Sequence, residues 1–283
     1  MRPCPLCDAE PTVVGSRVST FSDRRFTYAV CGSCGLGLVV DPRTDYANIY
    51  DEQYYRGDGA DKDVAYLSEM TEPRCIRHLE WDGLADSLSG HAPGVKVLDF
   101  GGGLGGLTRT LRARGIEAWC FEDEGYAAEW MRTHGIPAIG ELPDEPTFDV
   151  VFAVEVMEHL VDPLNALRAI RSVLRPGGRL IITTGNFGRA QQPLHEWYYA
   201  AIPDVHVTFW TPSAWTKALE MTGLKPDYSE PRLSVKVTQY KILKSLPSAM
   251  NGLRAVAPMW RPLAKYVDRR YGVSEFADGV VPE

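Results

Sequence analysis

The sequence predicts an α/β fold in which helices cover both faces of a mostly parallel, doubly wound sheet. From residue 95 onward, apolar runs of strand length alternate with segments whose apolar residues recur at helical spacing. The first of these runs ends at Asp99 and opens directly into a glycine loop from Gly101 to Gly106. Strands that alternate with helices in this way form parallel sheets that are buried on both faces. A small module with two cysteine pairs precedes this region.

The region from residue 95 onward divides into successive strands and helices. We expect strands at 95–99, 117–121, 138–139, 148–154 and 180–184, and a sixth at 224–228. The helix after the glycine loop ends at Gly115, because glycine commonly follows the last turn of a helix. Another helix begins at Asp162, an N-cap residue followed by proline, and residues 175–178 break it before the fifth strand. Two further helices are expected at 126–134 and 211–222.

A carboxylate follows the second strand at a position suited to recognising ribose. Ligands of doubly wound sheets lie at the carboxyl ends of the strands. Glu122 lies about 20 residues beyond the glycine loop and can accept hydrogen bonds from both ribose hydroxyls, with Asp123 as the second candidate. The same geometry suits NAD and S-adenosylmethionine. We interpret the spacing Gly101-x-Gly103-x-Gly105 as favouring S-adenosylmethionine, which has no phosphate to place at the helix N-terminus.

Four of the six cysteines form two pairs, Cys4 with Cys7 and Cys31 with Cys34, each separated by two residues. This spacing lets both thiolates of one turn bind a single tetrahedral zinc ion. Two disulfides or a redox pair are the competing interpretations, but thiols stay reduced in the cytosol and two redox pairs on one hairpin are rarer. Four thiolates leave no open coordination position, so the Zn²⁺ would be structural and would stabilise a small β-hairpin module over residues 1–44.

Residues 45–92 are expected to form a helical linker or lid between the cysteine module and the sheet region, which occupies 93–283. Its first part contains an aromatic cluster that includes Tyr50 and Tyr54, and a helix is expected over 63–88. Tyrosines at helical spacing are more often packing residues than recognition residues. A helical segment before the first strand is nevertheless well placed to cover a bound cofactor.

The motifs of the sheet region resemble those of class I S-adenosylmethionine-dependent methyltransferases, which have a Rossmann-like fold. The matching segments follow in the order of that family: 99–105, Glu122, 148–159 and 174–180. The cysteine module followed by 49–55 is similar to bacterial methyltransferases of secondary-metabolite and surface-sugar pathways. The resemblance implies a methyltransferase domain at 93–283, with insertions on the acceptor side, that transfers a methyl group to a small-molecule acceptor.

The resemblance also implies a role for each matching position. Backbone at Gly101 and Gly103 approaches the methionyl part of the cofactor, while Asp99 organises the loop or reaches the amino group through water. Glu122 holds the ribose. The remaining implied cofactor-binding positions are Glu141 and Leu142 at the adenine, and Ala153, Val154 and Glu155 on the methionyl side.

A base that accepts a proton from the acceptor near neutral pH is most simply a histidine. His206 is the first candidate, because it lies in a polar, aromatic-rich segment just before a helix. His195 is the second candidate and lies after the fifth strand, where acceptor-binding insertions usually occur. We interpret His159 as mainly structural.

Composition and charge limit the other classes of function. The 283 residues are 45% hydrophobic and 24% charged, their formal net charge is −7, and no apolar run approaches membrane-spanning length. We therefore expect a cytoplasmic protein that binds neither membranes nor nucleic acid. Two alternatives remain: an RNA methyltransferase, because some rRNA enzymes carry a zinc module before this fold, and a non-catalytic protein that keeps the fold as a binding scaffold. A helical, basic segment at 240–267 could cap the acceptor pocket or form a homodimer contact.

Overall fold

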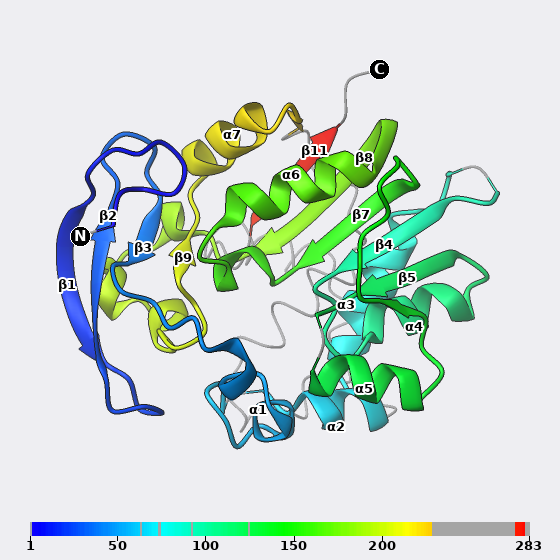
Figure 1. Ribbon diagram of the computed structural model, residues 1–283, viewed down its shortest axis with the longest axis horizontal. Helices are drawn as coiled ribbons and strands as arrows, with labels where there is room; N and C mark the ends of the chain where they lie inside the picture. The colour runs from blue at the N-terminus through cyan, green and yellow to red at the C-terminus, as the bar shows by residue number, and fades with distance from the viewer. Residues whose placement is uncertain are drawn as a thin grey trace, which may run out of the picture.

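Two β-sheets organise the chain (Figure 1). The computed structural model describes residues 2–62, 64–72, 75–91, 93–123, 125–227 and 275–280. In these ranges the larger sheet has the strand order β10-β11-β8-β7-β4-β5-β6. Its strands are β4 (Lys96–Phe100), β5 (Glu117–Phe121), β6 (Ala138–Ile139), β7 (Phe148–Val154), β8 (Leu174–Thr184), β10 (Lys225–Asp227) and β11 (Glu275–Val280).

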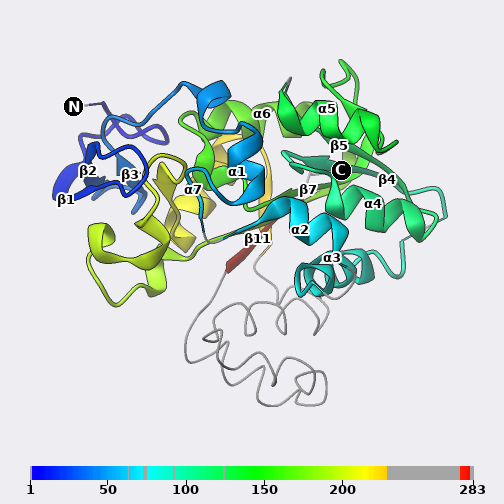
Figure 2. The ribbon, with the colours of Figure 1, turned by 90° about the horizontal axis from the view of Figure 1, so that it is seen from below.

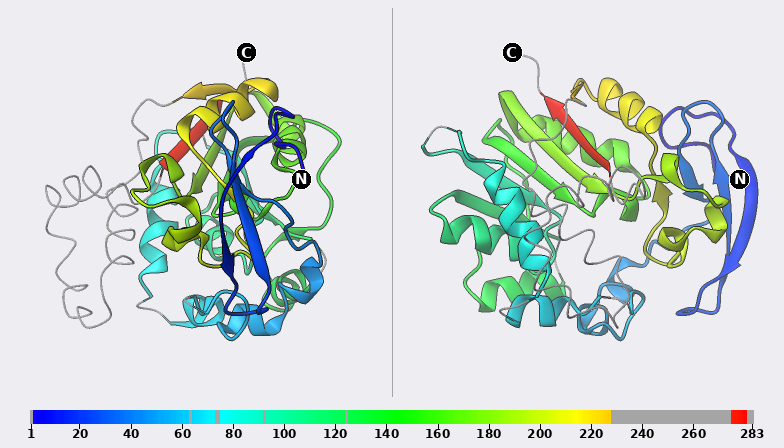
Figure 3. Two further views of the ribbon diagram at one scale, coloured as in Figure 1. Left: turned by 90° about the vertical axis from the view of Figure 1, so that its left-hand side faces the viewer. Right: turned by 180° about the vertical axis from the view of Figure 1, so that it is seen from behind.

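The strands from β6 to β8 are parallel, which confirms the predicted doubly wound, mostly parallel sheet. β11 runs antiparallel to both β8 and β10 and forms one end of the sheet with β10 (Figure 3). The chain proceeds outward from β4 to β5 and β6, then returns to the other side of β4 as β7. This reversal of strand order opens a crevice at the carboxyl ends of β4 and β7, where ligands of such sheets bind.

Helices cover both faces of the larger sheet, and each strand divides its side chains between them. Val97 and Val150 pack with α3 (Arg77–Asp86), α4 (Gly106–Ala113) and α5 (Tyr126–Thr133). Their neighbours Leu98 and Val151 pack instead with α6 (Pro163–Val173) and α7 (Pro212–Met221) on the opposite face. Successive residues of a strand point to opposite faces, so apolar residues at every position are what a sheet covered on both sides requires.

The local signals for α6 and α7 act as the sequence predicts. The Asp162 side chain accepts the Asn165 backbone N–H, and the Thr211 hydroxyl accepts the Ala214 backbone N–H. In both helices a proline occupies the first turn, where its missing N–H costs nothing. The expected break at 175–178 takes a different form: β8 begins at Leu174 directly after α6, and the pairing with β7 shifts register across these residues. They form an irregular part of the strand.

The smaller sheet is antiparallel and lies beside the larger one (Figure 1). Its order is β1-β2-β3-β9, and its strands are β1 (Thr12–Val18), β2 (Arg25–Val30), β3 (Gly37–Val39) and β9 (Thr208–Phe209). The predicted hairpin corresponds to β1 and β2. β9 comes from the segment between β8 and α7, so a strand distant in sequence joins the cysteine-containing segment. The domain boundary at residue 44 stays a prediction.

The segment between the two sheets contains shorter helices than the expected helix over 63–88. α1 (Glu52–Arg56) lies between the smaller sheet and α2 (Tyr66–Thr71), and α3 follows α2 (Figures 1 and 2). Short 3₁₀ turns complete the described elements: η1 (Tyr46–Asn48), η2 (Met157–His159), η3 (Phe187–Arg189), η4 (Leu194–Glu196) and η5 (Tyr198–Ala200). In the described part of the chain, no helix is long and apolar enough to cross a membrane. The predicted segment at 240–267 lies outside the described residues.

Candidate functional site

A pocket of about 630 Å³ opens at the carboxyl ends of β4, β5 and β7. Seven of the predicted cofactor-binding residues line it: Asp99, Gly101, Gly103, Glu122, Asp123, Val154 and Glu155. Three do not. Glu141 is exposed, Leu142 packs at the edge of the core that faces α6, and Ala153 is buried inside that core. The structure therefore brings together the residues predicted for the ribose and methionyl parts except Ala153, and leaves the two predicted for adenine outside the lining.

The glycine loop between β4 and α4 has a conformation that other residues rarely adopt. Gly103 has φ +56°, in the left-handed region. At Gly106 the requirement is close packing, because a Cβ there would overlap the ring of Trp81 on α3. The loop therefore exposes its backbone to the pocket on one side and allows the Trp81 ring of α3 to pack closely on the other.

Two carboxylates hold the glycine loop, one buried and one partly buried. Asp99 is 2% exposed and accepts both the backbone N–H and the hydroxyl of Thr108 in α4. Glu122 Oε2 accepts the backbone N–H of Gly103 at 2.7 Å. Burial raises the pKa of Asp99 to about 6 and that of Glu122 to about 7. Because one oxygen of Glu122 fixes the loop, its other oxygen is the one available to a ribose.

Tyrosines form the wall of the pocket opposite the sheet. Tyr55 stacks against Tyr126 with ring centroids 5.5 Å apart, and Tyr54 stacks against Tyr66 at 5.2 Å. Tyr50 meets the edge of Tyr54 at 4.9 Å. All five line the pocket. Burial raises the pKa of Tyr54 and Tyr55 well above the usual value, so these rings stay neutral. The sequence indicated this cluster as packing, and the structure places it both in the core and at the pocket.

Two glutamates after β7 share one tyrosine. Glu155 has φ +54°, an unusual value for a residue with a side chain, and such strain is often found at functional sites. The Tyr199 hydroxyl lies within hydrogen-bonding distance of Glu155 Oε2 and Glu158 Oε1. Thr183 also donates to Glu155. Glu158 is fully buried, and burial together with the negative charge of Glu155 raises its pKa to about 8. Sequence reasoning missed Glu158 and Tyr199. The only signal was the spacing Glu-x-x-Glu-His after a buried strand.

Two histidines adjoin these glutamates. His206 is buried, and its Nδ1–H donates to the backbone carbonyl of Tyr199 at 2.7 Å. Its ring stacks on Tyr199 and meets the ring of His159 edge-on, with centroids 4.8 Å apart. His159 lines the pocket, and its Nδ1 lies 2.9 Å from the Tyr50 hydroxyl. The predicted base His206 therefore lies one ring behind the pocket lining.

His195, the second predicted base, lies elsewhere. Its ring packs against Gly15 of β1, where a Cβ would overlap it. Its Nε2 is 3.6 Å from Glu196. It does not line the pocket. The segment after β8 therefore packs one of its histidines on the smaller sheet and directs the other, through the turn at η5, toward the pocket.

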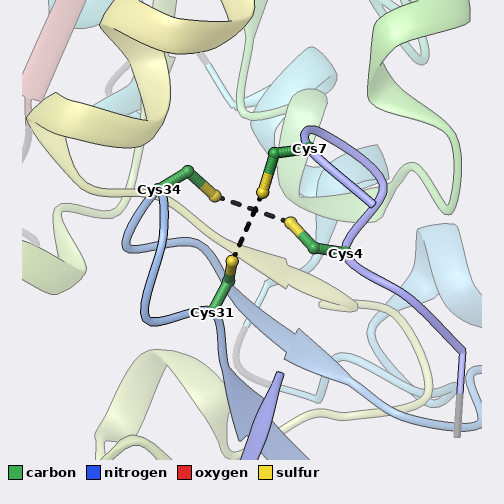
Figure 4. A group of neighbouring side chains, drawn as sticks. All are labelled: Cys4, Cys7, Cys31 and Cys34. Atoms are coloured by element: carbon green, nitrogen blue, oxygen red, sulfur yellow. Dashed lines mark hydrogen bonds between the residues drawn. The ribbon is translucent and has the colours of Figure 1, made fainter. Parts of the chain in front are cut away.

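The four N-terminal cysteines converge on one point (Figure 4). The Sγ atoms of Cys4 and Cys34 are 3.5 Å apart, as are those of Cys7 and Cys31. Both pairs form the same turn: the carbonyl of each leading cysteine accepts the N–H four residues later, and its own N–H donates to the carbonyl five residues later. Ligands 2.3 Å from a tetrahedral ion lie roughly 3.8 Å apart. All four are free thiols, and their arrangement fits a metal ion.

Comparisons with known proteins agree with this arrangement. A family model described as a methyltransferase domain matches residues 68–229. The ubiquinone biosynthesis O-methyltransferase of Alkalilimnicola ehrlichii is 30% identical over 169 residues, which cover 52% of this chain and 66% of that protein. The enzyme of the same name from Aeromonas salmonicida is 30% identical over 125 residues, 39% of this chain and 51% of that protein. The chain thus spans between half and two thirds of the length of these relatives.

A solved structure shares the fold. The phosphoethanolamine N-methyltransferase 2 of Haemonchus contortus, solved with phosphomonomethylethanolamine and S-adenosylhomocysteine, is 17% identical. It superposes with a TM-score of 0.55 over 86% of this chain and 62% of its own. The family model covers more than half of the chain and includes the glycine loop, the acid after β5 and the segment after β7. The chain therefore belongs to the family of S-adenosylmethionine-dependent methyltransferases.

Proposed function

We propose that this chain transfers a methyl group from S-adenosylmethionine to a hydroxyl of a small molecule, of the secondary-metabolite or sugar-derived kind. The observation that carries the proposal is the placement of Glu122 after β5 and Glu155 after β7, the two strands that flank β4, in one pocket. Glu122 would accept the ribose hydroxyls, and Glu155 lies on the methionyl side. The ubiquinone biosynthesis relatives are named as O-methyltransferases, which supports oxygen as the acceptor atom.

The pocket lining supports a small acceptor. Its volume of about 630 Å³ is in the range of pockets that bind one or two small ligands. The tyrosine wall offers aromatic faces to an apolar or planar acceptor and to the cationic sulfonium. Among the described residues that line the pocket, carboxylates outnumber basic side chains, and Arg77 is the one arginine. This balance suits a cationic cofactor and a neutral acceptor.

Methyl transfer is an in-line displacement in which the acceptor oxygen forms a bond to the methyl carbon as the carbon–sulfur bond breaks. The acceptor proton must leave, and the sulfur keeps the electron pair as S-adenosylhomocysteine forms. The enzyme contributes alignment and assistance with the proton. We propose that histidine assistance comes from His206 and the adjacent His159 and Glu158, since these reach the pocket through His159. His195 has no such connection.

We also propose that Cys4, Cys7, Cys31 and Cys34 bind one structural Zn²⁺. The converging sulfurs and the two equivalent turns support this. When bound, the ion would cross-link the two cysteine turns and would have no open position for chemistry. Free cysteines throughout the chain agree with a reducing, cytoplasmic setting.

Calorimetric titration of the purified full chain tests the proposed function. S-adenosylmethionine should bind with micromolar affinity and NAD should not. Turnover is then assayed with a panel of hydroxylated small molecules, comparing His206→Gln with His195→Gln. We expect His206→Gln to lower kcat at least tenfold, while His195→Gln retains kcat within about twofold. No binding of S-adenosylmethionine by the folded chain, or tight binding of NAD, would contradict the proposal.

A further inference from the structure

We propose that Glu158, His159 and His206 form a second metal site, which binds one divalent transition-metal ion beside the point of methyl transfer. The site is distinct from the four cysteines. Its existence rests on the geometry of these three residues, and its role rests on the proposed function.

The first observation is the convergence of three suitable ligand atoms. One ligand atom from each of Glu158, His159 and His206 lies within 4.8 Å of the other two. Ligands about 2.1 Å from an ion lie roughly 3.0–4.2 Å apart, depending on the angle between them, so a small closure of the side chains would complete the site. Two imidazoles and one carboxylate form a donor set that suits Zn²⁺, Mn²⁺ or Fe²⁺ and leaves positions open for a substrate oxygen.

The second observation is an orphaned carboxylate oxygen on one member of this cluster. Glu158 is fully buried, and its Oε2 has no hydrogen-bond partner among the described residues. Its other oxygen, Oε1, faces the Tyr199 hydroxyl. A buried carboxylate oxygen without a partner is costly, because it has given up its water and gained nothing in return. A bound cation would provide the missing interaction.

The histidines are oriented as metal ligands commonly are. His206 donates Nδ1–H to the backbone carbonyl of Tyr199, which leaves the lone pair on Nε2. Histidine ligands typically donate their second ring N–H to a carbonyl or another oxygen, which fixes the tautomer and the ring orientation. The Tyr50 hydroxyl oxygen, 2.9 Å from His159 Nδ1, can serve His159 in the same way.

The charges around the cluster also favour a cation. Tyr199 has one hydroxyl proton, so it can donate to Glu155 or to Glu158 at any moment, but not to both. Glu155 also accepts the Thr183 hydroxyl, so Glu158 competes for the Tyr199 proton with a carboxylate that has another donor. A divalent ion at Glu158 would offset this negative charge and would let Tyr199 donate to Glu155.

The ion would explain how the acceptor loses its proton. His159 and Glu155 line the pocket, so an ion held by His159 is within reach of a bound acceptor. Coordination of a hydroxyl oxygen by a divalent ion favours release of its proton, and the resulting oxygen anion is the better nucleophile toward the methyl carbon. With the ion bound, His206 acts as a ligand, and the released proton passes to solvent or to a neighbouring carboxylate.

Manganese titration tests the site, because Mn²⁺ prefers oxygen and nitrogen ligands and competes poorly for four thiolates. The full chain, with zinc retained at the cysteines, is titrated with Mn²⁺ and followed by electron paramagnetic resonance. Zinc content is measured by mass spectrometry in parallel. We expect one Mn²⁺ per chain, at least a tenfold loss of affinity in Glu158→Gln and His206→Gln, and an unchanged affinity in Glu117→Gln at the start of β5.

A further variant, Tyr50→Phe, and a separate measurement of S-adenosylmethionine binding distinguish loss of the metal site from loss of the fold or of the proposed function. Tyr50→Phe keeps the ring that packs in the pocket wall and removes only the contact to His159, so it should lower Mn²⁺ affinity about 10-fold or more while leaving the fold intact. Absence of a bound Mn²⁺ in the wild-type chain would overturn the proposal, as would undiminished binding in both ligand variants. Binding of S-adenosylmethionine is measured on the same samples. Methyl transfer that persists in excess chelator would refute the metal's role and leave the proposed function intact, whereas failure to bind S-adenosylmethionine would refute that function.

Discussion

Removal of the Glu122 carboxylate should weaken binding of S-adenosylmethionine by an amount that the structure allows us to estimate. One oxygen of Glu122 holds the Gly103 backbone N–H, and the other is available to the ribose hydroxyls. A hydrogen bond to a charged group contributes about 1.5–3 kcal/mol, and each 1.4 kcal/mol is a factor of ten in affinity. Glu122→Ala should therefore raise Kd roughly 10- to 150-fold.

The Glu122→Gln variant removes the negative charge of the side chain and keeps its shape, so it measures the contribution of the charge alone. The amide oxygen can still accept the Gly103 N–H, but charge-assisted hydrogen bonds are about twice as strong as neutral ones. We expect Kd to rise about 3- to 10-fold, less than in the alanine variant. Isothermal titration calorimetry measures both values. Glu117→Gln, at the exposed start of the same strand, is the control and should keep the wild-type Kd.

The pH dependence of binding gives an independent measurement of the same group. Burial raises the pKa of Glu122 to about 7, and ribose hydroxyls favour the ionised carboxylate as their acceptor. Below pH 7 the carboxyl holds a proton that must be released before tight binding, so affinity should fall by up to about tenfold for each further pH unit. In Glu122→Gln this slope should disappear. A Kd for Glu122→Ala within threefold of wild type, or an identical pH slope in both proteins, would refute the assignment of Glu122 to the ribose.

Three further predictions concern packing and the cysteines. Gly106→Ala places a methyl group on the Trp81 ring, so the free energy of unfolding should fall by about 1–3 kcal/mol in thermal and urea melts. The control variant Gly140→Ala has open space around the new methyl group and should leave this free energy nearly unchanged. Cys34→Ser should abolish binding of one zinc per chain by mass spectrometry and lower Tm, and an unchanged zinc content would contradict a four-cysteine site. Tyr28→Phe removes the buried donor to the Ala200 carbonyl and should lower the unfolding free energy by about 1–2 kcal/mol in the same melts.

The sequence was informative wherever the signal is local. The strand before the glycine loop, the acid at Glu122 and the proline-led helix starts after Asp162 and Thr211 each depend on residues that are close along the chain. The paired cysteines also belong here, because two copies of one turn can be recognised from their spacing. Periodicity and capping determine such features with little help from the rest of the molecule.

The rest depends on contacts that sequence spacing does not encode. β9 has two residues, too short to produce a pattern, and it exists because β3 offers an unpaired edge. The sequence indicated His206 and then His195 as candidate bases, yet His195 packs on β1 and His206 reaches His159. The site at Glu158 requires η2 and η5 to meet, and that depends on the packing of the segment after β8. The burial of a charged residue such as Glu158 cannot be predicted from the pattern of apolar residues, because it depends on how distant segments pack.

The pairing of β3 with β9 links the cysteine cluster to the chemistry of the pocket. Val207 lies between the two: its carbonyl accepts the N–H of Val39, and its own N–H donates to the carbonyl of Glu158. His206 is the residue immediately before it. Damage at the cysteines, by oxidation or by loss of a metal, would loosen β3 and with it the position of His206. The N-terminal sheet should therefore not be deleted or replaced on its own. Engineering of this protein should treat residues 4–39 and 204–209 as one structural unit.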